Sequence, residues 1–203
     1  MVSCIVLAAG SSSRFGSPKP LTLIRSRPLI ALLLEQLLKT QLGEIVVVLG
    51  ADADAIMPCV TANPRVHCVF NDNHKRGQTS SFKKGLECIS PAAQAAMLLP
   101  ADVPFVKPET VDKIIETFLK NPFAILIPTC GGRSGHPSVF SKKLFPEFAS
   151  LADEAPLSTI QHIHASEILK LPVCDESVTL SFNTPEELRM ITQILKTDHT
   201  IGL

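Results

Sequence analysis

Short apolar runs recur along the chain, separated by segments in which apolar residues return every three or four positions. The runs lie at residues 4–8, 45–49, 66–70, 95–99 and 124–127, and their length and composition are typical of buried strands. The intervening segments have the period of helices that bury one face. Alternation of strands and helices predicts a mostly parallel central sheet with helices on both faces. We therefore expect an α/β fold with a Rossmann-like three-layer α/β/α architecture.

Helical stripes are clearest in two segments. Their apolar residues are Leu29, Ile30, Leu33, Leu34, Leu37 and Leu38 in the first, and Val111, Ile114, Ile115, Phe118 and Leu119 in the second. Proline followed by acidic residues predicts helix starts at Pro108 and Pro185. Thr184 and Glu187 have the spacing of a capping box. Residues 140–180 are the least regular, and we expect a covering helix and one or two peripheral strands there.

The length and charge of the chain limit its possible partners. A chain of 203 residues can bury a sufficient core as one domain, so we expect a single domain over residues 1–203. The 19 basic and 19 acidic residues balance, which argues against nucleic acid or an anionic membrane as a partner. No apolar run approaches the roughly 18 residues of a membrane helix. A soluble protein is expected.

The six cysteines are scattered and form no Cys-x-x-Cys pair. Because most of them fall within apolar patterns, we expect reduced core thiols and a cytoplasmic location. His162 and His164 lie near Asp153 and Glu154 in the sequence. Their spacing matches no familiar zinc site, so we expect a polar surface there rather than a metal centre.

Residues 9–19 form a loop of small residues after the first strand, and they contain most of the chemistry of the N-terminal region. Gly10 and Gly16 allow the backbone to approach an anion closely, while Arg14 and Lys19 supply positive charge. The spacing is not that of a Walker A loop, because five residues separate the two glycines and Pro18 precedes the lysine. The loop also lacks the third glycine of a dinucleotide-binding turn. It is nevertheless suited to hold a triphosphate.

The pattern Leu-Ala-Ala-Gly-x-Ser-x-Arg-x-Gly-x-x-Lys over residues 7–19 resembles the signature of nucleotidyltransferases that attach a nucleoside monophosphate to a phosphorylated acceptor. Within that superfamily the chain is most similar to the molybdenum cofactor cytidylyltransferase and guanylyltransferase branch. The resemblance implies that Arg14 and Lys19 are catalytic and neutralise the triphosphate. It also implies nucleotide contacts along the same loop, from Leu7, Ala8, Ala9, Gly10, Ser11, Arg14 and Lys19.

Two further loops follow strands and should lie at the same edge of the sheet as the loop at residues 9–19. Asp102 ends the fourth strand between Pro100 and Pro104, where a carboxylate can hold a hard divalent cation. An ordinary turn aspartate is the alternative from the residues alone. In the family that the chain resembles, an Asp-x-Pro at this position is the metal ligand, which implies that Asp102 binds Mg²⁺ or Mn²⁺ and is catalytic.

The second metal-side motif of the family is Asp/Asn-Thr-Pro-Glu, which begins at Asn183 here. Because asparagine is neutral, Asn183 could ligate the metal directly or through water. The segment from Gly77 to Ser81 resembles the family segment beside the nucleoside, so Gly77, Thr79 and Ser80 are candidate nucleotide contacts, with Asn71 on the same edge. The hydroxyl groups could instead serve as N-caps of the following helix.

Residues 132–137 resemble the Gly-x-Arg-Gly-His-Pro segment on the acceptor side of the family's cleft. The resemblance implies acceptor contacts from Arg133, Gly135 and His136. Serine occupies position 134, where the family usually has arginine, and Arg133 lies one position earlier.

The expected function is transfer of CMP from CTP to a phosphorylated small molecule, with release of pyrophosphate. Molybdopterin or molybdenum cofactor is the leading acceptor, and a molybdoenzyme that receives the product is a further candidate partner. CTP is favoured because the resemblance associates a second alanine, here Ala9, with the cytidylyl branch. Three alternatives stay open: a GTP-using guanylyltransferase, a sugar- or alditol-phosphate nucleotidyltransferase, and a non-catalytic accessory protein that binds or inserts the cofactor.

Overall fold

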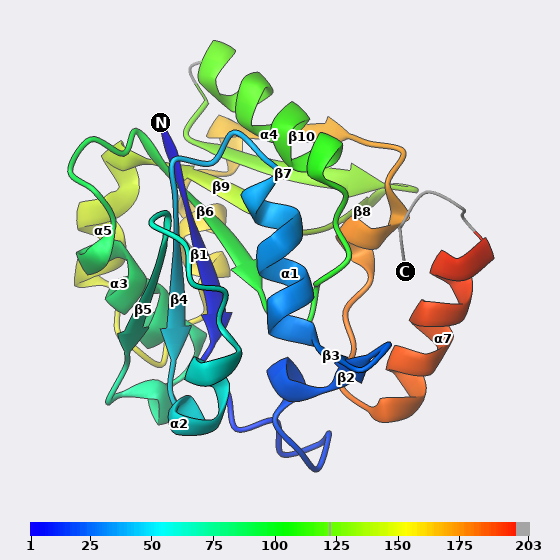
Figure 1. The fold of residues 1–203 in the computed structure, drawn as a ribbon. Helices are drawn as coiled ribbons and strands as arrows, with labels where there is room; N and C mark the ends of the chain where they lie inside the picture. The colour runs from blue at the N-terminus through cyan, green and yellow to red at the C-terminus, as the bar shows by residue number, and fades with distance from the viewer. Residues whose placement is uncertain (122, 198–203) are drawn as a thin grey trace.

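The structure is a computed structural model that describes residues 1–121 and 123–197. Within these residues, eight strands form one sheet in the order β10-β7-β9-β6-β1-β4-β5, with β8 paired to β7 (Figure 1). The strands are β1 (Val2–Ala8), β4 (Glu44–Leu49), β5 (Val66–Phe70), β6 (Ala95–Pro100), β7 (Ile125–Cys130), β8 (Arg133–Ser134), β9 (Ser138–Ser141) and β10 (Ile168–Pro172). A separate hairpin consists of β2 (Leu23–Ile24) and β3 (Arg27–Pro28).

The sheet is mostly parallel, as predicted. β1 lies between β4 and β6 and is parallel to both, β5 is parallel to β4, and β10 is parallel to β7. Every residue of β1, β4 and β6 is buried, because helices cover both faces of the sheet. Such strands read as continuous apolar runs, which explains why the sequence pattern located them.

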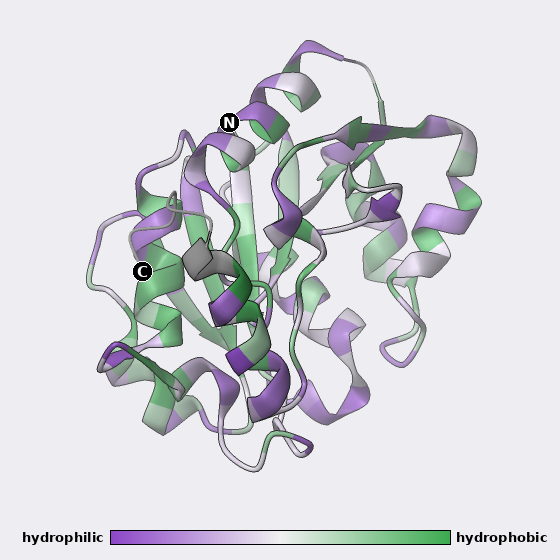
Figure 2. Ribbon diagram, turned by 90° about the vertical axis from the view of Figure 1, so that its right-hand side faces the viewer, coloured by the Kyte–Doolittle hydropathy of each residue, from purple (hydrophilic) through white to green (hydrophobic). Residues whose placement is uncertain are grey.

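Helices occupy both faces of the sheet, which confirms the three-layer α/β/α prediction. They are α1 (Leu29–Leu38), α2 (Ala53–Ile56), α3 (Gln78–Cys88), α4 (Pro108–Lys120), α5 (Phe145–Ser150), α6 (Ser158–Ile163) and α7 (Pro185–Thr197). The first apolar cluster joins α1, α2 and α4 to one face, and the second joins α3, α5 and α6 to the other. Hydrophobic residues therefore concentrate along the strands, between the layers (Figure 2).

A third, smaller apolar cluster joins α7 to the segment after β1. Its members are Phe15, Leu29, Phe105, Phe182, Leu188 and Ile191. The rings of Phe15 and Phe182 meet edge to face, with their centroids 5.5 Å apart. The cluster therefore packs the start of α7 and the segment before it against the loop that follows β1, although these segments are distant in the sequence.

The predicted helix starts are confirmed at Pro108 and Pro185, where α4 and α7 begin. The capping box of α7 is also present. The amide N–H of Glu187 donates to Oγ1 of Thr184 at 3.2 Å, and the amide N–H of Thr184 donates to Oε2 of Glu187 at 3.3 Å.

Strand β9 corrects the prediction for residues 140–180. We expected a covering helix and one or two peripheral strands there. α5 and α6 do cover one face and β10 lies at the edge. β9, which enters this range with its last two residues, instead lies inside the sheet and is antiparallel to both β6 and β7. Its central residues Val139 and Phe140 are fully buried. The strand has four residues with serine at each end, so its apolar pattern is too short to detect.

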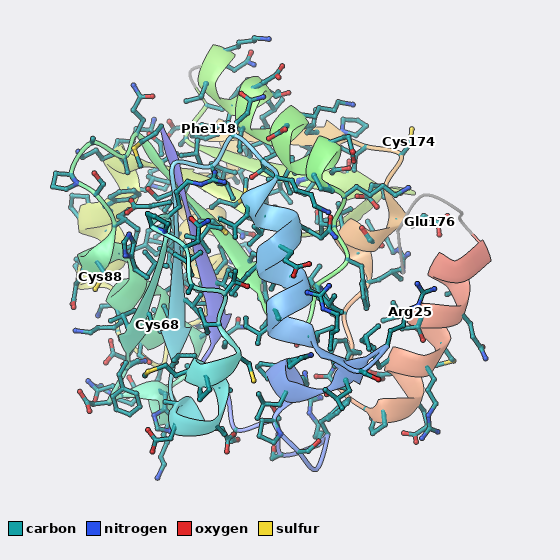
Figure 3. All side chains as sticks on the ribbon, viewed as in Figure 1. Arg25, Cys68, Cys88, Phe118, Cys174 and Glu176 are labelled. Carbon is teal, nitrogen blue, oxygen red and sulfur yellow. The ribbon has the colours of Figure 1, made fainter. Side chains whose placement is uncertain are left out.

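The cysteines also differ from the expectation of core thiols. Among the described residues all six are free, but only Cys4 is buried, and burial raises the pKa of its thiol. Cys68, Cys88 and Cys174 are exposed and lie on separate parts of the molecular surface (Figure 3). Cys68 is exposed because β5 is an edge strand. None of the described helices is long and apolar enough to cross a membrane.

His164, at the end of α6, lies between two carboxylates. Its Nε2 is 2.8 Å from Oε2 of Glu147 and its Nδ1 is 2.9 Å from Oε1 of Glu167. Hydrogen bonds to Glu147 and then to Glu167 raise the pKa of His164 above its usual 6.5. These two contacts connect α5 to the segment before β10.

We expect this contact to stabilise the fold below about pH 6.5 and to lose its effect as the pH rises through the raised pKa of His164. His164→Gln should lower the free energy of unfolding by about 0.5–1 kcal/mol at pH 6 and progressively less at higher pH. Urea unfolding from pH 6 to 9 measures the difference. His162→Gln, on an exposed position of the same helix, is the control. An effect independent of pH would contradict the role of the charge.

Candidate active site

A cavity of about 300 Å³ lies at the carboxyl ends of the parallel strands. It is formed by the loop after β1, the segment between β5 and α3, and the loop after β6, as predicted from the order of strands and loops. Strand order reverses beside β1, where open α/β sheets bind their ligands. The lining residues are Leu7, Ala8, Ala9, Gly10, Ser12, Lys19, Pro20, His74, Gly77, Gln78, Ser81, Pro100, Ala101 and Asp102.

The loop after β1 is held by a tight turn and by Ser12. The amide N–H groups of Phe15 and Gly16 donate to the carbonyl oxygen of Ser12 at 2.8 and 3.2 Å. The hydroxyl oxygen of Ser12 accepts the amide N–H of Lys19 at 3.0 Å. Phe15 is buried in the third apolar cluster, so the loop is anchored on both sides of Arg14. Its cations are therefore positioned by the fold.

Lys19 and Asp102 line one end of the cavity, and hydrogen bonds link them to Asn183 and Arg14, which are not lining residues. The four residues come from three distant parts of the sequence. The ammonium group of Lys19 lies 2.9 Å from Oδ2 of Asp102 and 3.2 Å from Oδ1 of Asn183. A guanidinium nitrogen of Arg14 donates to the same amide oxygen at 2.9 Å. The structure thus brings together all the residues that were predicted to neutralise the triphosphate or to hold a metal.

Asn183 is held by the start of α7. Its amide N–H donates to Oε2 of Glu187 at 2.5 Å, so the capping box that begins the helix also fixes the backbone of Asn183. The ammonium group of Lys19 lies 5.4 Å from the centre of the Phe182 ring, a cation–π distance. Phe182 of the third apolar cluster therefore lies next to both residues: it contacts Lys19 through its ring and precedes Asn183 in the chain.

The donor set at this end of the cavity fits a hard divalent cation. Asp102 supplies a carboxylate and Asn183 an amide oxygen, and a Mg²⁺ or Mn²⁺ site often completes its ligands with substrate phosphates and water. The side chain of Asp102 is 29% exposed, so it is accessible from the cavity. Among the described residues no group of three or more His, Cys, Asp or Glu side chains could hold a metal ion by itself, so a cation here would depend on the nucleotide for further ligands.

The segment from Asn71 to Ser81 differs in detail from the expected nucleoside contacts. Gly77 lines the cavity, but Asn71, Thr79 and Ser80 are buried and are not among its lining residues. The hydroxyl of Thr79 donates to the carbonyl of Ala155 at 2.5 Å, and that of Ser80 donates to the carbonyl of Gly77 at 2.9 Å. The hydroxyls are not N-caps of α3 either, because the N-cap is Gly77 and no side chain makes a capping hydrogen bond there.

A second cavity, of about 420 Å³, adjoins the first through Gly77 and Gln78. His136 and Leu98 line it, together with residues of the segment before α6. Burial lowers the pKa of His136, while the charge of Asp102 and a hydrogen bond to the backbone of Leu98 act in the opposite direction. His136 is therefore neutral at pH 7, and its buried Nδ1 has no partner in the described residues.

The other predicted acceptor residues lie away from this cavity. Gly135 packs against the backbone of Val178, whose carbonyl oxygen would lie 2.2 Å from a Cβ at position 135. Its amide N–H donates to the carbonyl of Pro128 at 2.8 Å. Arg133 is exposed and donates to the hydroxyl of Thr179 at 3.2 Å. Glycine is required at position 135 by this close approach.

Several lining residues were not predicted from the sequence. Ser12, and not the predicted Ser11, lines the cavity. The family pattern over residues 7–19 could have indicated this, because its serine falls at position 12. His74 and Gln78 flank Gly77 and also line the cavity, as does Ser81. No spacing signal distinguishes His74 from other polar residues of its loop.

Comparison with known proteins identifies the family of the chain. Residues 4–168 match the sequence model of the MobA-like NTP transferase domain. A probable molybdenum cofactor guanylyltransferase of Geobacillus sp. (strain WCH70) is 24% identical over 190 residues, which cover 90% of this chain and 94% of the relative. The bifunctional protein GlmU of Burkholderia lata is 26% identical over 137 residues, which cover 66% of this chain. The match spans only 30% of the length of that protein.

Solved structures share the fold over almost the whole chain. Rv0371c from Mycobacterium tuberculosis H37Rv superposes with a TM-score of 0.81 at 26% identity, covering 95% of this chain and 97% of that one. A second structure of Rv0371c, in complex with manganese, has a TM-score of 0.77 at 25% identity and covers 95% of this chain and 98% of that one.

Proposed function

The chain belongs to the MobA-like NTP transferase family, and on that basis we propose that it transfers CMP from CTP to a phosphorylated small molecule. The leading acceptor is molybdopterin or molybdenum cofactor, and a molybdoenzyme would receive the product. The observation that carries the proposal is the hydrogen-bonded group of Arg14, Lys19, Asp102 and Asn183, of which Lys19 and Asp102 line the cavity. The two cationic side chains can stabilise negative charge on the phosphates, and the oxygen atoms beside them can bind a metal ion that does the same.

In the proposed reaction, a phosphate oxygen of the acceptor attacks the α-phosphorus of the nucleotide. The new P–O bond forms as the bond to the β-phosphate bridging oxygen breaks, and pyrophosphate leaves with that electron pair. Arg14 and Lys19 neutralise the charge that develops on the phosphates. Mg²⁺ or Mn²⁺ held by Asp102 and Asn183 would supply further positive charge at the same place. The manganese complex of Rv0371c supports this choice of metals.

A phosphate acceptor does not require a general base from the protein. The second pKa of a phosphate monoester is roughly 6, so the acceptor arrives largely deprotonated at pH 7. His136 lines the second cavity, and burial favours its neutral form. It is therefore suited to form a hydrogen bond with the acceptor rather than an ion pair with the acceptor phosphate. We assign His136 to acceptor binding, and retain Arg133 and Gly135 as weaker candidates on the same side.

Ala9 supports CTP as the nucleotide. It lines the cavity and is only 4% exposed, so its methyl group occupies space that a glycine would leave to a larger base. We expect kcat/KM for CTP to exceed that for GTP by about tenfold or more, and Ala9→Gly to reduce the ratio. Pyrophosphate release with each nucleotide and purified molybdopterin or molybdenum cofactor measures it.

Guanylyl transfer is the second candidate, favoured by Asn183 and by the name of the Geobacillus relative. Equal or faster turnover with GTP would establish that alternative in place of ours. Sugar and alditol phosphates in the same assay test the remaining enzymatic alternative. Binding of nucleotide and cofactor without pyrophosphate release would indicate a non-catalytic accessory protein.

A further inference from the structure

The two ends of the nucleotide cavity differ in charge. At the β6 end, Lys19 and Asp102 face each other. At the β5 end, the lining side chains are His74, Gln78 and Ser81. A triphosphate bound beside Lys19 would place the base of the same nucleotide across β1, toward the β5 end. His74 and its neighbours are therefore placed to contact the nucleobase.

The hydrogen bonding of His74 determines what it can offer a base. Its Nδ1 lies 3.1 Å from the carbonyl oxygen of Asn71. A carbonyl oxygen only accepts, so Nδ1 must carry the hydrogen of this bond. In a neutral imidazole the other nitrogen, Nε2, is then a hydrogen-bond acceptor. The ring also packs against Phe70, with centroids 6.4 Å apart, which limits its rotation.

Asn71 holds the carbonyl that orients His74. Its side chain is buried, and its Nδ2 donates to the hydroxyl oxygens of Ser80 and Ser81 at 3.0 Å each. Its Oδ1 accepts the amide N–H of Asn73, also at 3.0 Å. These bonds attach the loop to the start of α3. Asn71 thus holds the position of His74 through its backbone carbonyl.

Gly50 permits the close approach of His74 to the loop after β1. A Cβ at position 50 would lie 2.6 Å from the carbonyl oxygen of Ala9 and 2.7 Å from Cβ of His74. Only glycine leaves room for both neighbours. His74 is therefore packed beside Ala9, which we have assigned to the base end of the cavity.

We propose that His74 recognises the nucleobase by accepting, at Nε2, a hydrogen bond from an exocyclic amino group. For CTP this is the 4-amino group of cytosine. UTP has a carbonyl oxygen in its place, which would face the Nε2 lone pair without a shared hydrogen. His74 thus selects amino-bearing bases over uracil. This inference rests on the proposed function, since it requires a nucleoside triphosphate in the cavity.

The test measures binding by calorimetry with Mg²⁺ and without acceptor. The probes are CTP, UTP and the triphosphate of the pyrimidin-2-one ribonucleoside, which lacks the amino group. We expect the wild-type protein to bind CTP about tenfold more tightly than the pyrimidin-2-one analogue, the value of one good hydrogen bond. His74→Phe keeps an aromatic ring but no acceptor, so it should bind both probes equally. His67→Phe, on the exposed face of β5, is the matched control and should keep the preference.

A tenfold preference that persists in His74→Phe would overturn the inference. The ¹⁵N resonance of His74 Nε2 in the wild-type protein gives a measurement that does not depend on the variant folding. It should shift with CTP and not with the pyrimidin-2-one analogue, and equal shifts would also overturn the inference. If only GTP binds, the cytidylyl proposal fails, and GTP against ITP, which lacks the 2-amino group, tests His74 in the same way. Failure of all nucleoside triphosphates to bind would remove both proposals.

Discussion

Replacing Asp102 with asparagine is expected to lower kcat by about a hundredfold to a thousandfold. The change removes the carboxylate at the charged end of the cavity, where it faces Lys19 and can hold a divalent cation. Loss of one positioned charge or metal ligand at a phosphoryl-transfer site costs on the order of 10²–10³ in rate, and this residue supplies the site's carboxylate. Pyrophosphate release at saturating Mg²⁺ and nucleotide measures the effect.

The fold of this variant should be retained. Asp102 is partly exposed, and its ion pair with Lys19 contributes on the order of 1 kcal/mol or less to stability. Urea unfolding of Asp102→Asn should therefore resemble that of the wild-type protein. Asp54→Asn, an exposed aspartate of α2 on the same edge of the sheet, should keep full activity. A near-normal rate in Asp102→Asn would remove Asp102 from the metal site.

The strands that could be predicted are those that are buried on both faces, because their sequences are continuous runs of apolar residues. β1, β4 and β6 have helices on both sides, so each appears as an uninterrupted apolar run. β9 is equally buried at its centre, but four residues with serine at each end give no period to recognise. Its position between β6 and β7 depends on tertiary contacts that the local sequence does not contain.

The site divides in a similar way. The loop after β1 could be identified because its glycines and cations are close together in the sequence. The contact of Lys19 with Asn183 joins residues 164 positions apart, and before the structure only the resemblance to a family connected them. His74 was missed because its importance comes from a fixed ring and a lining position, neither of which leaves a motif.

Lys19→Ala is expected to lower kcat by about 10²–10³, since it removes a positive charge that the transition state uses. The same change should strengthen Mn²⁺ binding in the absence of nucleotide by about fivefold. Without nucleotide, the Lys19 ammonium contacts both Asp102 and Asn183, so it competes with a cation for their oxygens. A partly buried contact of this kind is worth on the order of 1 kcal/mol, which sets the size of the effect. Metal binding is followed by calorimetry and turnover by pyrophosphate release.

These opposite effects separate charge competition from general damage to the site. If Lys19 only maintained the shape of the loop after β1, its loss would weaken Mn²⁺ binding and turnover together. Lys39→Ala removes an exposed lysine that contacts only Gln36 among the contacts described, and should change neither quantity. Stronger metal binding with slower turnover in Lys19→Ala would mean that the nucleotide draws Lys19 away from Asp102 and Asn183. Metal and nucleotide would then bind cooperatively, each making the site available to the other.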